Sequence, residues 1–475
     1  MKKSNIINAL IATILIIAAP GSALAASLLE VYQQALQSDP LIHEAEARRL
    51  AALEAEPQAR GVLFPQISAD GDWAENETKG VGFFQDDATG DVRQGDVKTE
   101  RDGYQWSVSL RQTLFRWDQI IGLRRADKVV ARAEADREAA QQDLIVRVTQ
   151  RYFDVLAAED QLLAIHANRN AIARQLEQAK QRFEVGLIAI TDVQESQAAY
   201  DRAGADEIAA KRQLATARGY LREITGSYID ELAAPTEDLP LSTPNPEQES
   251  AWVELSLAQN LTLVASRIDE RLARDDIALR RTGHYPTVDL VASTGESEYD
   301  IEQRGASGQI SSYENPGEDT RIGIQFSIPL FSGGVTSSQV RESVYLHRAS
   351  LESLQRVTRE TERQARDAYL GVLSEISRVK ALERAVESSR TALEATQAGF
   401  DVGTRTIVDV LNFQFQLYQS ITNYQQSRYD YLINYMRLKQ AAGTLQVQDL
   451  EVLEPFLKDR KSPEDQFAEE AANSE

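Results

Sequence analysis

The sequence contains no cysteine, so the chain holds no disulfide bond and no cysteine that could carry a lipid anchor. No run of 18 apolar residues follows the first 25 residues, and this argues against a membrane-spanning helix. Cationic residues are in the minority, because 51 Lys and Arg stand against 73 Asp and Glu. The resulting net charge of −22 argues against a nucleic-acid partner.

Proline is missing from two long parts of the chain, one between Pro65 and Pro235 and the other between Pro329 and Pro455. Both parts are rich in Ala, Gln, Glu, Arg and Leu, most of which favour helix. The proline distribution therefore predicts two very long helical segments.

The residues of familiar catalytic and metal sites are also scarce. Only four histidines occur, and they are scattered without metal-ligand spacing: His43, His166, His284 and His347. The sequence has no glycine-rich phosphate loop and no GxSxG nucleophile signature. We therefore expect no catalytic residues, no metal site and no cofactor, and a secreted enzyme is disfavoured.

The first 25 residues have the order of a secretory signal peptide. Lys2 and Lys3 form a basic start, residues 6–19 are an apolar run, and Ala23-Leu24-Ala25 is a small-x-small cleavage signal. Removing the two lysines takes the net charge from −22 to −24.

An internal repeat organises the remainder of the chain. "RFEVGLIAITDV" at 182–193 aligns with "GFDVGTRTIVDV" at 399–410, and this offset of 217 holds without a gap to Gly226 and Gly443. A repeat of this length indicates a duplicated domain-sized unit. The predicted segments are a signal peptide at 1–25, a first structural repeat at 26–231, a linker at 232–249, a second repeat at 250–445, and a final segment at 446–475 whose acidic tail has a composition typical of disorder.

Each repeat contains a pair of strands followed by a helical hairpin. Alternating apolar and polar residues predict strands at about 63–74 and 104–115, and again at about 285–295 and 321–331. The intervening stretches at about 75–103 and 296–320 are rich in Gly, Asp, Glu and Ser, as loops are. Helical hairpins are predicted at about 118–226 and 335–443.

Two environments fit these strands. A soluble sandwich with one wet face has the same alternation as a transmembrane barrel. The expected signal peptide favours the barrel. Because about eight strands make the smallest membrane barrel, a chain with four would have to share one barrel with other chains.

The long helices show a seven-residue apolar repeat. Val372, Val379, Val386 and Leu393 are seven residues apart, and each helix of about 68 residues would extend roughly 100 Å. Such narrow apolar stripes need partner helices along their whole length.

Both repeats carry a turn after the long helix. Gly186 and Gly403 suit the left-handed position after a helix end, and Thr191 with Gln194 and Thr406 with Asp409 resemble capping boxes. As local structure the two phrases are hairpin turns, in which Asp192 and Asp409 favour helix N-termini. This interpretation does not account for Arg405 beside the second turn.

Several of these motifs together resemble the TolC family of outer-membrane efflux and secretion channels, the outer membrane factors. The motifs are "VGLIAITDV", "VGTRTIVDV", "YDYLINY" at 429–435, "GTLQVQDL" at 443–450 and "GHYPTVDLVASTG" at 283–295, and the resemblance covers about residues 28–453.

The resemblance implies a mixed α and β membrane protein that forms a homotrimer. Three chains would build one 12-stranded outer-membrane β-barrel, continued into the periplasm by an α-helical barrel of coiled-coil hairpins. Segments near 227–260 and 445–460 would form an equatorial belt. The molecule would be an exit duct in outer-membrane lipid, recruited by a periplasmic adaptor (membrane fusion) protein and an inner-membrane RND, MFS or ABC-type transporter. Drugs, bile salts, other small toxic compounds or proteins of type I secretion would leave through it.

The resemblance also assigns roles to the two turns. Arg405 matches a family arginine that links neighbouring hairpins through Thr191 and Asp192 and closes the periplasmic entrance until the hairpins untwist. Asp409 matches a position in an acidic constriction ring, where like charges would raise one another's pKa and bind cations. The adaptor-docking tips correspond to Val185, Gly186, Leu187, Val402, Gly403 and Thr404.

Two residues depart from the family pattern. Phe400 replaces a tyrosine that donates a hydrogen bond to the residue at Asp192, and Asn412 replaces a second acidic ring. We therefore expect a closed state with fewer polar links and a single acidic ring. The alternative function is a periplasmic coiled-coil tether that conducts nothing.

Overall fold

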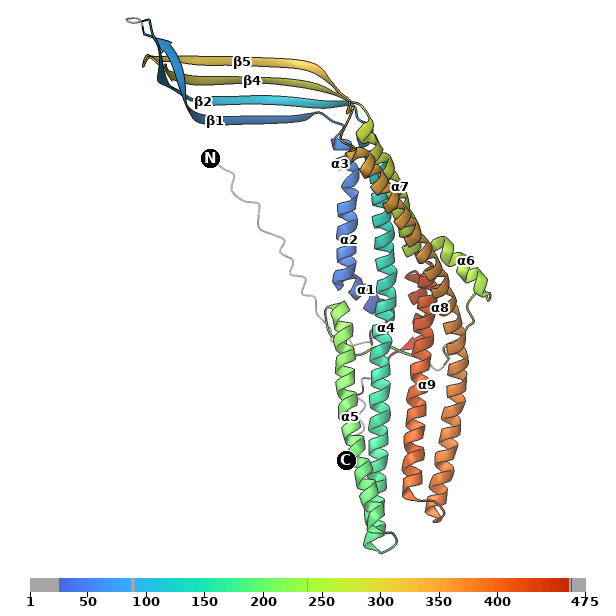
Figure 1. Cartoon of the computed structure of the whole chain (residues 1–475). Helices are drawn as coiled ribbons and strands as arrows, with labels where there is room; N and C mark the ends of the chain where they lie inside the picture. The colour runs from blue at the N-terminus through green and yellow to red at the C-terminus, as the bar shows by residue number, and fades with distance from the viewer. Residues whose placement is uncertain (1–24, 87–89, 237, 461–462, 464–475) are drawn as a thin grey trace, which may run out of the picture. The chain divides into compact units, whose positions relative to one another are not determined.

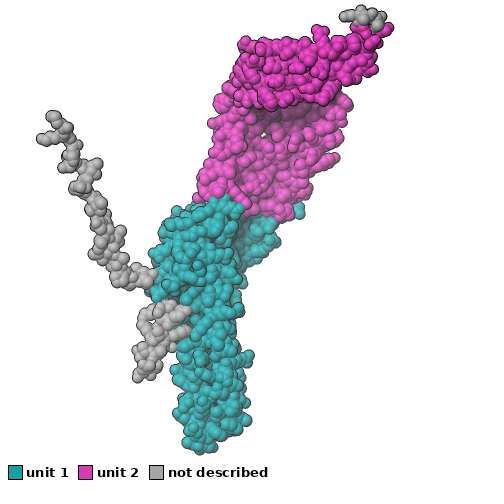
Figure 2. Space-filling view, turned by 90° about the vertical axis from the view of Figure 1, so that its left-hand side faces the viewer, with its two compact units in different colours: residues 1–44, 138–261, 359–475 teal, residues 45–137, 262–358 magenta. Residues whose placement is uncertain are grey.

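The computed structural model describes residues 25–86, 90–236, 238–460 and 463. All but the last residue of the expected signal peptide lies outside these ranges. The chain divides into two compact units, coloured separately in Figure 2. Unit 1 comprises residues 1–44, 138–261 and 359–475, and unit 2 comprises residues 45–137 and 262–358.

The helices carry the labels of Figure 1. In chain order they are α1 (Leu28–Ser38), α2 (Pro40–Leu53), α3 (Ala55–Gly61), α4 (Trp117–Glu184), α5 (Ile190–Thr225), α6 (Glu249–Gln259), α7 (Leu261–Arg281), α8 (Val335–Asp401), α9 (Ile407–Ala441) and α10 (Gln448–Glu451). None of the helices in the described part of the chain has an apolar stretch long enough to cross a membrane.

Unit 2 contains an antiparallel sheet of four strands in the order β1–β2–β4–β5, which lie side by side in Figure 1. The strands are β1 (Gln66–Gln85), β2 (Val92–Phe115), β4 (Thr287–Arg304) and β5 (Ile310–Ser327). The pairing of β2 with β4 joins the two repeats. Gly103 lies opposite Tyr299 in this pairing, and a Cβ at Gly103 would come within 2.7 Å of the tyrosine ring.

The strands are longer than the sequence predicts, so the expected loops at 75–103 and 296–320 are mostly strand. Propensity disfavours their Gly and acidic residues, but pairing that begins in the apolar part continues residue by residue to Gln85 and Arg304. Pro316 is tolerated because β5 is an edge strand. The last strand ends at Ser327 and not at 331, since Pro329 has no N–H for the ladder.

One face of the sheet carries an exposed apolar band near the helical end of the strands. The register places the band residues on the same face: Ile67, Trp73, Trp106, Val108, Leu110, Leu290, Ile322, Ile324 and Phe326. The opposite face is polar and forms a hollow of about 350 Å³ lined in part by Asp70, Asp72 and Asp319. The sheet is therefore amphipathic, as the alternation predicts.

Charged pairs hold α7 against its neighbours in unit 2. Arg132 Nε lies 2.5 Å from Asp269 Oδ1, and Arg125 Nη2 lies 3.1 Å from Asp276 Oδ1. On the side of α8, His347 Nε2 lies 2.8 Å from Glu270 Oε1. The two arginine pairs join α4 of the first repeat to α7 of the second, and the histidine pair joins α7 to α8 within the second repeat.

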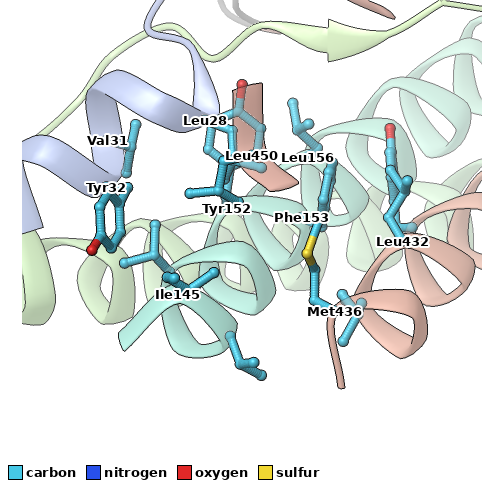
Figure 3. Packing of buried hydrophobic residues seen from close by; sticks show 14 of the residues in the cluster. Leu28, Val31, Tyr32, Ile145, Tyr152, Phe153, Leu156, Leu432, Met436 and Leu450 are labelled. Atoms are coloured by element: carbon cyan, nitrogen blue, oxygen red, sulfur yellow. The ribbon is translucent and has the colours of Figure 1, made fainter. Parts of the chain in front are cut away.

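Unit 1 contains two helical hairpins, one of α5 with the second part of α4 and one of α9 with the second part of α8. Figure 3 shows part of the hydrophobic core of this unit. Residues from α1, α4, α9 and α10 meet there, including Leu28, Val31, Tyr152, Phe153, Met436 and Leu450. The Phe153 ring stacks on Tyr429 with a centroid distance of 5.4 Å.

The seven-residue repeat lies on the inner side of α8. Val372 and Val379 are buried, as are Tyr369 and Ile376 between them, and Val386 is half-buried. The periodicity therefore identified the buried stripe of this helix.

The residues around Ala26, the linker and β6 meet on the same core of unit 1. β3 (Ala234–Pro235) pairs with β6 (Leu457–Lys458), and the Tyr152 hydroxyl donates to the carbonyl oxygen of Ala233 at 2.5 Å. Residues 454–460 thus lie against the core of unit 1, and most of the acidic tail lies outside the described residues. A backbone pairing and the ion pair of Arg460 with Asp160 fix this short segment.

Candidate functional site

The two turns that the sequence repeats have the same backbone geometry. In the first, Leu187 N–H donates to the Arg182 carbonyl at 2.9 Å and Gly186 has φ +78°. In the second, Thr404 N–H donates to the Gly399 carbonyl at 2.8 Å and Gly403 has φ +81°. Both are Schellman ends of a long helix, in which glycine takes the left-handed position.

The starts of the following helices differ. Thr406 caps α9 with a full capping box, in which Asp409 N–H donates to Thr406 Oγ1 at 3.2 Å and Thr406 N–H donates to Asp409 Oδ2 at 3.0 Å. The expected capping box of Thr191 with Gln194 is wrong, because α5 begins one residue before Thr191 and its N-cap is Ala189. The repeat register aligns Ala189 with Thr406, and alanine has no oxygen to accept a bond.

Asp409 is an ionised carboxylate in a fixed position. Hydrogen bonds from the Thr406 backbone and hydroxyl, together with the charge of Arg405, hold the pKa of Asp409 below its ordinary value. Its side chain is half-exposed, and Asn412 is exposed one helical turn later. The constriction residues that the resemblance implies therefore lie on the first turns of α9.

Arg405 is exposed, and its side chain folds back over Gly399, where an added Cβ would meet Arg405 Cγ at 2.8 Å. Within the described residues of this single chain, Arg405 forms no hydrogen bond or ion pair with Thr191 or Asp192. The link that the resemblance implies thus requires a second chain or another arrangement.

The tips expose large apolar side chains. Val185, Leu187 and Val402 are 70%, 73% and 75% exposed. Gly186 and Gly403 leave open space beside them. The residues to which the resemblance assigns adaptor docking thus lie at the two turns, with their apolar side chains exposed.

Arg182 is a tip residue that the sequence analysis missed. Its guanidinium lies 4.8 Å from the centroid of the Phe400 ring, and its Nη2 lies 3.5 Å from Asp401 Oδ1. The repeat aligns Arg182 with Gly399, so the comparison of the two copies gave no indication of a contact. The sequence feature that could have drawn attention to Arg182 is its place as a basic residue in the last turn of α4.

A polar cluster lies inside the first hairpin. Burial disfavours the charge of Glu207, but hydrogen bonds from Lys211 and Arg169 outweigh this effect and lower its pKa to about 2. Arg169 also donates to the Tyr200 hydroxyl at 3.0 Å. This cluster fixes the pairing of α4 with α5.

A second charged cluster lies where the chain ends meet. Arg460 Nη1 lies 2.5 Å from Asp160 Oδ1, and the Tyr429 hydroxyl donates to Asp160 Oδ2 at 2.6 Å. Burial raises the pKa of the neighbouring Glu159 to about 7, although Arg218 lies 3.1 Å away. The segment that follows β6 is held by this cluster.

Comparisons with known proteins agree on the kind of molecule. The family model described as "Outer membrane efflux protein" matches residues 31–227 and 252–444, two segments that correspond to the two repeats. The chain is 37% identical over 426 residues to the outer membrane protein TolC of Vibrio cholerae, covering 90% of this chain and 92% of that protein.

A second relative and a solved structure give the same result. The alkaline protease secretion protein AprF of Pseudomonas aeruginosa is 30% identical over 435 residues, with 91% of this chain and 87% of AprF covered. The outer membrane protein VceC of Vibrio cholerae shares the fold with a TM-score of 0.66 at 19% identity, covering 88% of this chain and 96% of VceC. The chain therefore belongs to the outer membrane efflux protein family.

Proposed function

We propose that three copies of this chain form an exit duct in the outer membrane that conducts solutes from the periplasm to the outside. The observation that carries the proposal is the four-stranded sheet with one exposed apolar face and one polar face. Family membership supports the outer-membrane location.

The strand count supports a shared barrel. Within the described residues, β1 and β5 each pair on one side only. An unpaired strand edge is very unfavourable in lipid, because its N–H and C=O groups find no water there. Three chains supply twelve strands, and closure then leaves no edge.

The hairpins of unit 1 extend the duct into the periplasm. Their narrow buried stripes need partner helices, which neighbouring chains provide in a ring of hairpins. Arg405 of one chain links to Thr191 and Asp192 of a neighbour and holds the entrance closed. The hairpins untwist when these links break.

Three copies of Asp409 form the acidic constriction, which favours cations. The exposed apolar tips around Val185, Leu187 and Val402 receive a periplasmic adaptor, which couples the duct to an inner-membrane transporter. The cargo comprises small toxic compounds, and the similarity to an alkaline protease secretion protein extends it to secreted proteins.

Purified protein tests the proposal in two measurements. The native mass in detergent should equal three chains, and the protein should conduct ions across a planar lipid bilayer. A trimer that never conducts would support a periplasmic tether in place of a duct. Deletion of the gene in the host should cause sensitivity to dyes and detergents or loss of a secreted protein.

A further inference from the structure

The tips of the two hairpins are joined within one chain by Arg182. This arginine lies in the last turn of α4, and its two partners lie in the last turn of α8. The guanidinium lies 4.8 Å from the Phe400 ring centroid and 3.5 Å from the Asp401 carboxylate. One side chain therefore contacts two consecutive residues of the other hairpin.

Each hairpin is held together by its own interior near the tip. Leu176, Ala179 and Val193 form a small apolar cluster inside the first hairpin. In the second hairpin the hydroxyl oxygens of Ser389 and Ser420 lie 3.2 Å apart. These contacts bind helix to helix within a hairpin and do not join one hairpin to the other.

Links between the hairpins are sparse at this level. Among the described residues, Arg182 makes the only hydrogen-bond, ion-pair or ring contact that joins residues 170–206 to residues 382–413. Farther from the tip, Gln414 donates to the Asn168 carbonyl at 3.5 Å. Arg182 is therefore the polar link between the two hairpins at the level of the tips.

The chemistry of Phe400 fits this role. Phenylalanine has no hydroxyl and cannot donate to Asp192, but its ring face attracts a cation. A guanidinium is planar and weakly hydrated, so it stacks on a ring more readily than an ammonium group does. The hydrogen bond that the family tyrosine makes to the residue at Asp192, on α5, is thus replaced by a ring contact with Arg182, on α4.

We propose that Arg182 is a positioning residue of the periplasmic gate, which latches the first hairpin to the second through the ring of Phe400 and the carboxylate of Asp401. The latch rests on the proposed duct function. It acts within one chain, whereas Arg405 acts between chains. When the entrance opens, the contacts of Arg182 with Phe400 and Asp401 must break.

Planar-bilayer recordings of the full-length protein test the latch. Arg182→Gln removes the charge but keeps a long polar side chain, and Lys180→Gln is the matched control, because Lys180 is an exposed cation of the same helix turn. We expect Arg182→Gln to raise the mean single-channel conductance about twofold or more, since loss of an exposed cation–π contact shifts a two-state equilibrium by a small factor. Lys180→Gln should behave as wild type.

Two further variants separate the latch from a general loss of structure. Phe400→Leu keeps an apolar side chain without a ring face, and it should raise the conductance as Arg182→Gln does. The double variant should give no additional increase, because both changes remove the same contact. Additive increases would overturn the latch.

The outcomes also separate this inference from the proposed function. If the wild type and Arg405→Ser both fail to conduct, the duct itself is wrong. If Arg405→Ser raises the conductance while Arg182→Gln and Phe400→Leu match Lys180→Gln, the duct stands and the latch is overturned.

Discussion

Asp192 and Asp409 occupy the same position in the two repeats, the third residue of a helix, but their surroundings differ. Asp409 forms a capping box with Thr406, whereas Ala189 has no side-chain oxygen to cap α5. The second carboxylate is therefore fixed in place and ionised, and the first is free to engage another chain. This difference makes Asp409 the better candidate for a cation-binding ring.

Asp409→Asn tests the ring. Asparagine keeps an oxygen that can accept the Thr406 bonds, so the change removes charge with little change of structure. We expect block by divalent or trivalent cations added on the periplasmic side to require about tenfold more cation, because one constriction loses three charges. Glu394→Gln is the matched control, since Glu394 is an exposed carboxylate on α8. Block at an unchanged concentration would place the ring elsewhere.

Glu159 makes stability depend on pH in the opposite sense to most carboxylates. Its folded-state pKa of about 7 lies above the ordinary value of 4.5. Between pH 4.5 and pH 7 the carboxyl is therefore protonated in the folded protein and ionised in the unfolded chain. Its contribution is complete below pH 4.5 and is lost as the pH rises through 7. The loss is on the order of 3 kcal/mol.

Glu159→Gln should therefore reduce the fall in Tm between about pH 5 and about pH 8, because glutamine cannot release a proton. Thermal unfolding of the full-length protein at both values measures the effect. Glu383→Gln, at an exposed position of α8, should leave the fall unchanged. An equal fall in wild type and Glu159→Gln would show that Glu159 does not titrate in this range.

At the scale of elements, the sequence predicted the helices better than the strands. The heptad pattern predicted the buried residues of α8 from Tyr369 to Val379, because a long helix repeats its apolar spacing over many turns. The strands extend past their apolar part because cross-strand pairing continues among residues whose own propensity disfavours it. Strand length therefore depends on the partner strand, which a local pattern does not contain.

At the tips, too, the sequence predicted local features and missed a contact between distant residues. Gly186 and Gly403 are in the predicted left-handed position, since a helix end is a local event. The cap of α5 was placed two residues too late, because Thr191 offers the right side chain at the wrong position. Arg182 was missed because its partners lie more than 200 residues away, and only the folded chain brings them together.

Gly403 offers a test of the tip as an element. Gly403→Ala places a Cβ at φ +81° and should destabilise the turn by about 1 kcal/mol, which amide hydrogen exchange of residues 397–406 would detect as faster exchange. Gly371→Ala is the matched control in the same helix, where a Cβ meets open space. It should instead stabilise α8 by about 0.5–1 kcal/mol. Equal effects of the two changes would contradict the assigned turn geometry.

The ordered end of the chain is a second element with a testable role. Arg460→Ala leaves the buried Asp160 with Tyr429 alone and should destabilise the protein by about 1–3 kcal/mol, measured as a lower Tm. Lys458→Ala is the control, since Lys458 is exposed in β6, two residues before Arg460. If both variants match the wild type, the ion pair does not hold the chain end.

At the scale of the whole molecule, duplication explains why one chain carries two unequal tips. The repeats share their turns and their element order, but only the second has a capped acidic residue and an adjacent arginine. The duplication was readable from the sequence. The number of chains was inferred from the strand count and from membership of the family, because one chain contains no complete barrel.

The central claim is that the entrance of a conducting duct is closed by links at these tips, and single-channel conductance of Arg405→Ser in planar bilayers tests it most directly. Serine removes the cation that joins neighbouring chains while leaving the backbone turn intact. We predict a conductance about twofold or more above that of the wild type, because a lost link shifts the population toward the open state. A conductance equal to that of the wild type would contradict the account.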